Sequence, residues 1–197
     1  MPKIVDHDLY RKELLYKCFD LFVEKGYGST TMRQIAQGLG VSTGALYHYF
    51  PSKEVLFLQL VDEQTQQGIG NFLNEGSTAK NLPERIDAMV NFVAQYEDYF
   101  FKQLVLCCDF CQQQGREDFL NNQILQQSWQ QSRKAIADYL QLGDRAIADF
   151  ILTFFHGLIV GRLYEGDRID IYEQGKLLKT MLLPYLETKT GNNNIQD

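Results

Sequence analysis

TMRQIAQGLGVSTGALYHYFPSK, residues 31–53, contains the start and stop signals of two short helices and the start of a third. Thr31 and Gln34 have the spacing of a capping box, which predicts a helix that begins just after Thr31. Gly40 is a suitable end for it. Ser42 predicts the next N-terminus, and Pro51 ends that helix because proline disfavours helical backbone in the residue before it. The stretch therefore predicts two short helices joined by a turn that contains glycine.

Two short helices joined in this way form a helix-turn-helix, a motif whose second helix enters the major groove of DNA. A helix of about two turns is marginal by itself, so its neighbours must hold it in place. We expect five apolar residues to do so: Ile35, Ala36, Leu39, Val41 and Leu46. This leaves the polar and aromatic residues of the second helix on its outer face, where a groove can be read.

The same stretch supplies three helix N-termini, which Thr31, Ser42 and Ser52 would cap. Unpaired N–H groups and partial positive charge at such ends suit phosphate. Lys53 adds a full positive charge at the third end. Tyrosine and histidine donate hydrogen bonds without adding much net charge, so this segment can bind DNA although it is only weakly basic.

Base recognition would come from the first helix and from the outer face of the second. Arg33 is the candidate for a bidentate contact with guanine, and Thr43 and Ala45 are candidates for base edges or a thymine methyl group. An ordinary helical bundle would instead use Tyr47 and its neighbours as surface and core residues, but the combined pattern favours DNA. The candidate DNA contacts are Thr31, Arg33, Ser42, Thr43, Ala45, Tyr47, His48, Tyr49 and Lys53.

Residues 15–58 resemble the DNA-binding domain of the tetracycline-repressor (TetR) family of transcription regulators. The stretch GYGSTTMRQIAQGLGVSTGALYHYFPSKEVLF, residues 26–57, follows the family pattern G-(Y/F)-x-x-T-T-x-x-x-I-A-x-x-x-G-V-S-x-G-x-(L/I)-Y-x-Y-F-x-S-K-x-x-L. The matching positions are Gly26, Tyr27, Thr30, Thr31, Ile35, Ala36, Gly40, Val41, Ser42, Gly44, Leu46, Tyr47, Tyr49, Phe50, Ser52, Lys53 and Leu56.

The resemblance implies a homodimer of subunits with about nine helices, which usually represses transcription and releases a palindromic operator when a small molecule binds. It also assigns DNA contacts to Thr31, Arg33, Thr43, Tyr47, His48, Tyr49 and Lys53. Gly44 would face the groove closely but has no side chain with which to read a base. Beyond residue 60 the family has no common motif, so the resemblance implies no particular effector.

Composition is consistent with this division of the chain. Its 197 residues carry a net charge of −6, but residues 1–60 hold seven basic and six acidic residues, so only this part tolerates a polyanion. The remainder follows helical periodicity without convincing period-two alternation. We therefore predict an all-α protein of about nine helices. Its domains would be a three-helix DNA-binding domain (1–52), a helical ligand-binding and dimerisation domain (53–190), and a disordered polar tail (191–197).

Two C-terminal segments are candidates for a dimer interface. Residues 144–163 are apolar on more than one face, and Gly157 and Gly161 would permit close helix approach. Plain core packing must account for part of this surface. A second apolar stripe follows in residues 177–185. The candidate interface residues are Ile151, Phe154, Leu158, Leu178, Met181, Leu182 and Tyr185.

The central helices contain aromatic residues that would suit an effector pocket, although helical aromatic stripes are more often core. The candidate pocket residues are Met89, Phe92, Tyr96, Phe100, Leu104, Cys108, Trp129 and Phe155. Cys111 shares a helix face with Cys107, four residues before it, and with Cys108, three residues before it, so thiol sensing or soft-metal binding by the three cysteines is an alternative. Core packing is the favoured interpretation, because free cysteine is usually buried.

Catalytic motifs are missing from the sequence: it has no G-x-S-x-G, no H-E-x-x-H and no glycine-rich phosphate loop. We predict no enzyme activity, no cofactor and no catalytic or metal site; a helical small-molecule-binding enzyme is the remote alternative. The N-terminus has no apolar core of signal-peptide length, and we expect no membrane-spanning stretch and a cytoplasmic location.

Overall fold

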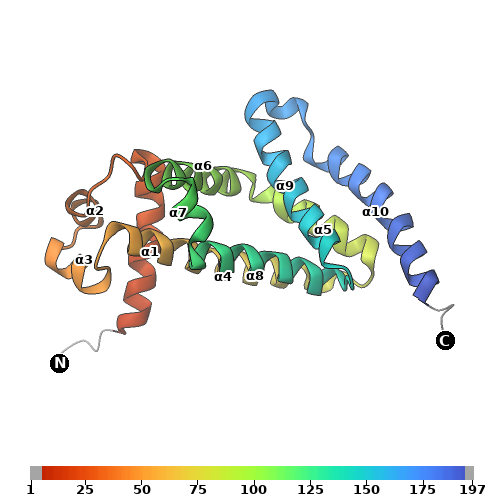
Figure 1. Ribbon diagram of the computed structural model, residues 1–197, viewed down its shortest axis with the longest axis horizontal. Helices are drawn as coiled ribbons and strands as arrows, with labels where there is room; N and C mark the ends of the chain where they lie inside the picture. Colours follow the sequence, from red (N-terminus) through yellow and green to blue (C-terminus); the bar gives the residue numbers. More distant parts are fainter. Residues whose placement is uncertain (1–5, 194–197) are drawn as a thin grey trace. The chain divides into compact units, whose positions relative to one another are not determined.

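The computed structural model describes residues 6–193, with side chains up to residue 186, and every regular element in this range is helical (Figure 1). The predicted all-α class is therefore confirmed. The elements are α1 (His7–Lys25), α2 (Met32–Leu39), α3 (Thr43–Tyr49), α4 (Lys53–Glu75), η1 (Gly76–Thr78), α5 (Leu82–Gln95), α6 (Glu97–Gln114), α7 (Arg116–Asn121), α8 (Gln123–Leu140), α9 (Arg145–Glu165), η2 (Gly166–Arg168) and α10 (Ile171–Asn193).

Within the described residues the structure has one α-helix more than the nine expected, because the region from Arg116 to Leu140 forms two helices, α7 and α8. Asn122 lies between α7 and α8 in an extended conformation. Its side-chain oxygen accepts hydrogen bonds from the backbone N–H groups of Ile124 and Leu125, at 3.1 and 3.2 Å. Asn122 therefore acts as an N-cap, and this local alternative ends one helix and begins the next.

The chain divides into two compact units. The first unit contains the chain up to Gly68 together with Lys102–Ser132, and the second contains Ile69–Phe101 and the chain from Arg133 onwards. Helices α4, α6 and α8 contribute residues to both. The units therefore do not follow the expected boundary near residue 52, and the functional division at that point stays a prediction.

The first unit is built around an apolar core shared by the N-terminal helices and α6. Phe110 of α6 stacks on Phe57 of α4 with ring centroids 4.5 Å apart. The Tyr27 ring packs edge-on against both of them at 4.9 Å. Of the five residues expected to join α2 and α3, Ile35, Ala36 and Leu46 are buried and Leu39 and Val41 are half-buried. The predicted helix-turn-helix packing is therefore confirmed.

The second unit contains the pair α5 and α10, which pack along each other. A Cβ atom added to the buried Gly175 would lie 2.5 Å from Cγ1 of Val90, so only glycine permits this close approach. Lys179 and Asp87 form an ion pair across the same helices. Helix α10 extends over Gly191–Asn193, at the start of the expected disordered tail; the rest of that tail lies outside the described residues, and its disorder stays a prediction.

Helix α9 differs from our expectation that no stretch could span a membrane. Together with η2 it covers residues 145–168, a stretch long and apolar enough to do so by length and composition alone, with a mean hydropathy of 1.6. Its residues Ile147, Ala148, Ile151, Leu152, Phe155, Leu158 and Ile159 are buried in the protein. Length and composition do not distinguish a membrane span from the core helix of a soluble protein, which satisfies the same test.

Candidate nucleic-acid interface

The start of α2 has the capping box that the sequence predicts. The Gln34 N–H donates to the Thr31 hydroxyl oxygen at 3.3 Å, and the Gln34 side-chain oxygen accepts from the Thr31 N–H at 2.9 Å. Gly40 ends the helix with a φ of 70°, a left-handed conformation that favours glycine. These contacts fix both ends of an eight-residue helix that would be marginal alone.

The other two predicted caps are also present. The Ala45 N–H donates to Ser42 Oγ, and the Val55 N–H donates to Ser52 Oγ, each at 3.1 Å. The first of these bonds begins α3, and the second lies at the first turn of α4. The first unit thus holds three capped helix starts within 22 residues of sequence, each with further N–H groups that can bind an anion.

The outer faces of α2 and α3 expose most of the predicted DNA contacts. Leu46 is buried on the inner face of α3, whereas Tyr47 is 49% exposed on the outer face. The exposed candidates are Thr31, Arg33, Ser42, Ala45, Tyr47 and His48, and the half-buried ones are Thr43, Tyr49 and Lys53. We call this set of nine residues the reading surface. Its roles in DNA contact stay predictions.

Comparison with known proteins agrees with this geometry. The family model described as bacterial regulatory proteins, tetR family, matches residues 15–60. The transcriptional repressor KstR2 of Mycobacterium tuberculosis is 30% identical over 138 residues, which span 68% of this chain and 66% of KstR2. The chain belongs to the TetR family. The match thus extends well beyond the DNA-binding segment of this TetR-family chain.

Two other relatives show how far the likeness reaches. The uncharacterised regulator YuxN of Bacillus subtilis is 30% identical over 97 residues, which are 47% of this chain and 33% of YuxN. The curated relatives named here are thus matched over a third to just under two thirds of their own length. The solved structure of the fatty acid degradation regulator FadR from Bacillus halodurans aligns with a TM-score of 0.68 at 16% identity, covering 87% of this chain and 97% of FadR. At that identity the likeness shows the fold alone.

Tyr49 is anchored to the first helix of this TetR-family chain. Its hydroxyl forms a hydrogen bond with Nδ1 of His7 at 2.8 Å, and its ring packs edge-on against Tyr10 at 5.5 Å. The end of α3 is therefore tied to the start of α1. Sequence reasoning did not assign His7 a role, because residues 42 positions apart give no local signal of contact.

Lys53 lies at the edge of the reading surface, but its ammonium group is directed at the protein. Nζ donates to the backbone oxygen of Tyr27 at 2.8 Å and lies 4.1 Å from the centre of the Tyr27 ring. Burial lowers the pKa of Lys53, and the nearby Asp109 carboxylate opposes that shift. A phosphate contact by Lys53 stays a prediction, and it requires the ammonium group to bind phosphate in addition to, or in place of, the Tyr27 backbone oxygen.

The candidate pocket residues are divided between the two compact units. Met89, Phe92 and Phe155 are buried in the second unit. Tyr96 and Phe100 place their rings 4.7 and 6.0 Å from that of Phe92, so these aromatic residues form one cluster there. The remaining three, Leu104, Cys108 and Trp129, belong to the first unit. The pocket role of all eight stays a prediction.

The candidate interface residues fall into two groups. Phe154 is half-buried, while Met181 and Tyr185 are exposed. The other four are buried within the second unit and have little surface to offer a second chain: Ile151, Leu158, Leu178 and Leu182. Sequence periodicity could not separate these groups, because α9 is apolar on more than one face. Additional apolar side chains are exposed on the same two helices: Phe150, Val160, Leu163, Tyr164, Tyr172 and Leu177.

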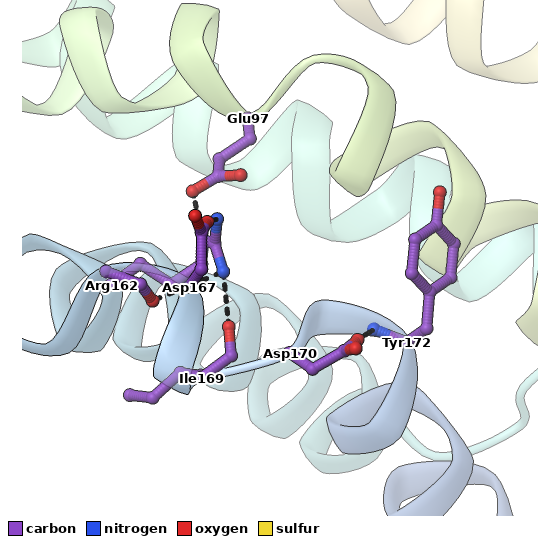
Figure 2. A network of polar contacts seen from close by, with 7 residues as sticks. Glu97, Arg162, Asp167, Ile169, Asp170 and Tyr172 are labelled. Atoms are coloured by element: carbon purple, nitrogen blue, oxygen red, sulfur yellow. Dashed lines mark hydrogen bonds and ion pairs between the residues drawn. The ribbon is translucent and has the colours of Figure 1, made fainter.

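Arg162 organises the corner between α9 and α10 (Figure 2). Its guanidinium donates to the carboxylates of Glu97 and Asp167 and to the backbone oxygen of Ile169. The hydrogen bond to Glu97 raises the pKa of Arg162. An open groove of about 440 Å³ lies beside it, lined by Glu97, Asp98, Phe101, Ile159, Arg162 and Leu163. None of the predicted pocket residues lines this groove.

The cysteine alternative gains no support from the structure. Cys107 and Cys111 are half-buried and Cys108 is exposed. Burial raises the pKa of the Cys107 thiol to about 12, so it stays protonated at neutral pH and is a poor nucleophile and metal ligand. Among the described residues, no group of three His, Cys, Asp or Glu side chains could hold a metal ion.

Proposed function

We propose that this protein is a DNA-binding transcriptional regulator, and specifically a repressor. The observation that carries the proposal is the reading surface. It combines three capped helix starts with exposed hydrogen-bond donors on α2 and α3, including Arg33 and Tyr47. Helix starts and neutral donors bind phosphate, and arginine reads guanine, so phosphate contacts would position the protein and a few side chains would specify the sequence.

The regulator would act as a homodimer on a palindromic operator. Exposed apolar side chains on α9 and α10, such as Phe150, Leu177 and Met181, support a second copy of the chain as the partner. A two-fold dimer presents two recognition helices to successive major grooves about 34 Å apart, so its operator must be palindromic. Binding to DNA places the protein in the cytoplasm, and the proposed activity needs no cofactor.

A small-molecule effector would release the operator. Two buried polar atoms of the first unit, Gln59 Oε1 and Ser128 Oγ, have no hydrogen-bond partner among the described residues, and Ser128 is only 6% exposed. Buried polar atoms are normally paired, so these two side chains offer hydrogen-bonding groups that a bound small molecule or a bound water would satisfy. An effector need only bind one conformation better than the other, and typical couplings are about 1–3 kcal/mol.

The test is selection of DNA fragments by the purified full-length protein, followed by affinity measurements on the fragment retained. Replacing Tyr47 by Phe removes one exposed hydroxyl and should weaken binding by about fivefold, the order of one hydrogen bond. Tyr16→Phe is the matched control, because Tyr16 is an exposed tyrosine on α1, outside the reading surface and outside the exposed apolar surface of α9 and α10. Retention of no fragment, or equal loss in both variants, would contradict the proposal. Compounds that release the fragment would then identify the effector.

A further inference from the structure

The turn between α1 and α2 is held by residues from two other helices. Lys53 Nζ, at the start of α4, donates to the backbone oxygen of Tyr27 at 2.8 Å. Asp109 Oδ2, on α6, accepts from the backbone N–H of Gly28 at 3.1 Å. The Tyr27 oxygen and the Gly28 N–H belong to one peptide group. A cation and an anion from separate helices therefore bind opposite ends of the same peptide, an arrangement we call the Tyr27–Gly28 clamp.

Packing around the clamp leaves the turn little freedom. Tyr27 is only 2% exposed, and its ring packs edge-on against the stacked rings of Phe57 and Phe110 in the core of the first unit. Gln114 Nε2 donates to the Tyr27 hydroxyl at 3.2 Å. Asp109 precedes the buried Phe110, so the packing of Phe110 fixes the helix backbone from which the Asp109 side chain extends. The contacts come from two helices, α4 and α6, within one compact unit.

Electrostatics favours this arrangement. A peptide group has partial negative charge on its oxygen and partial positive charge on its N–H, so an ammonium at one end and a carboxylate at the other are both attracted. The Asp109 carboxylate acts on Lys53 in the opposite direction to burial and so helps to keep its ammonium charged. Two of the partners, Asp109 and Gln114, lie about 50 residues beyond the family-matched segment.

The turn leads directly into the reading surface. Thr31, which caps α2, follows Gly28 by three residues, and α2 carries Arg33 and packs on α3. We propose that Lys53 and Asp109 are positioning residues for DNA binding, which fix the Tyr27–Gly28 peptide and thereby the direction of α2. This inference rests on the proposed function. In this inference Lys53 acts on DNA binding indirectly, by holding the turn, whereas the family resemblance implies that Lys53 contacts a phosphate directly.

The first test replaces Asp109 in the full-length protein and measures affinity for the fragment that the wild type selects. Asp109→Ala removes the acceptor and should weaken binding by about tenfold, the order of one hydrogen bond to a charged group. Asp109→Asn keeps a side-chain oxygen that can accept from Gly28, and should restore most of the affinity. Glu117→Ala is the matched control, since it removes an exposed carboxylate on α7 in the same unit.

The second test uses Lys53→Ala and the dependence of affinity on salt. Loss of a phosphate contact lowers the slope of log affinity against log salt by about 0.9 per contact, whereas loss of a positioning residue leaves the slope unchanged. We expect weaker binding with an unchanged slope. In both sets of variants, the amide signal of Gly28 in NMR spectra should shift or lose protection from exchange, and this readout needs no DNA.

The outcomes separate this inference from the proposed function. A wild-type protein that retains no fragment overturns the proposed function, and the positioning role falls with it. If the wild type binds but Asp109→Ala binds equally well, only the positioning role is overturned. A slope lowered by about 0.9 in Lys53→Ala would show a phosphate contact instead. Equal defects in Asp109→Ala and Asp109→Asn, with a normal Gly28 signal in both, would also overturn the inference.

Discussion

Helices α3 and α10 each bury one face in the protein, yet they expose opposite kinds of side chain on the other. On α3 the buried Leu46 is followed by Tyr47 and His48, whose polar tips face outward. On α10 the buried Leu178 lies between Leu177 and Met181, which are 55% and 61% exposed. Both helices therefore bury an apolar face within the chain, but only α10 also carries apolar side chains on its exposed face.

The difference indicates what kind of partner each surface takes. Exposed hydrogen-bond donors on a capped helix bond to water when no polyanion is bound, so leaving them uncovered costs little free energy. Contiguous apolar side chains in water mark a surface that is covered in the functional state. The proposed DNA contact and the proposed dimer contact thus follow from the same comparison, and each can be tested by a change that the isolated chain should tolerate.

The largest effect should come from charge on the open side of α10. Leu177→Glu combined with Met181→Glu should convert the dimer to monomer, because an unpaired carboxylate is costly to bury in an apolar interface. DNA affinity should fall by roughly 100-fold or more, since the monomer loses the gain of binding two half-sites at once. Sedimentation and DNA binding measure the two effects.

Lys176→Glu is a suitable control for this pair. Lys176 is exposed on the same helix and forms a surface ion pair with Glu173, so Lys176→Glu changes the net charge by the same two units as the double variant but touches no apolar side chain. It should leave the dimer intact, because surface ion pairs contribute little. A double variant that remained dimeric with its fold preserved would place the interface elsewhere.

Two glycines extend the comparison, because neither is required by packing within the chain. A Cβ atom added to Gly44 of α3, or to Gly157 of α9, would have no atom within 4 Å. Both residues are exposed in helices, where alanine is more stable than glycine by up to about 1 kcal/mol. Any harm from alanine at these positions must therefore come from a partner molecule.

Gly44→Ala should weaken DNA binding by roughly tenfold, within the range of a single mismatched base pair. The added methyl group would hold α3 away from the base edges, while the free energy of unfolding stays equal or rises. Gly70→Ala, at another open helical glycine, controls for the general effect of alanine. Unchanged DNA affinity in Gly44→Ala would mean that α3 does not approach the groove closely at this residue.

The helix boundaries of the N-terminal part could be predicted because the determining signals are local. Thr31, Gly40, Ser42 and Pro51 each act within about four residues, and the observed caps and ends agree with them. The break at Asn122 was missed, since asparagine in a long helical pattern can either cap a helix or lie on its surface. Which of the two roles such an asparagine takes depends on the direction in which the chain continues after it.

The contacts of the candidate site could be predicted less well, because they depend on residues far apart in the sequence. Nothing near Lys53 signals that its ammonium binds the Tyr27 oxygen or that Asp109 lies beside it. In the same way, Ile151 and Phe154 looked equivalent in an apolar helix, although only Phe154 keeps exposed surface. Periodicity identifies a buried face only where the opposite face is polar.

The smallest effect concerns α9. Gly157→Ala should raise the dimer dissociation constant by about threefold to tenfold, the order of a mild packing defect. The methyl group would keep two copies of α9 apart, whereas in the monomer it meets nothing and favours the helix. The measurements are the dissociation constant by dilution and the midpoint of thermal unfolding.

Gly68→Ala is the control, because Gly68 is also helical and open within the chain but lies on α4. It should leave the dissociation constant unchanged. If Gly157→Ala dimerised as well as the wild type and unfolded at a higher temperature, Gly157 would face solvent in the dimer. The exposed apolar residues of α10 would then have to form the interface without a close approach of the two chains at Gly157. A weaker dimer together with a more stable monomer would instead place Gly157 at the contact between the two copies.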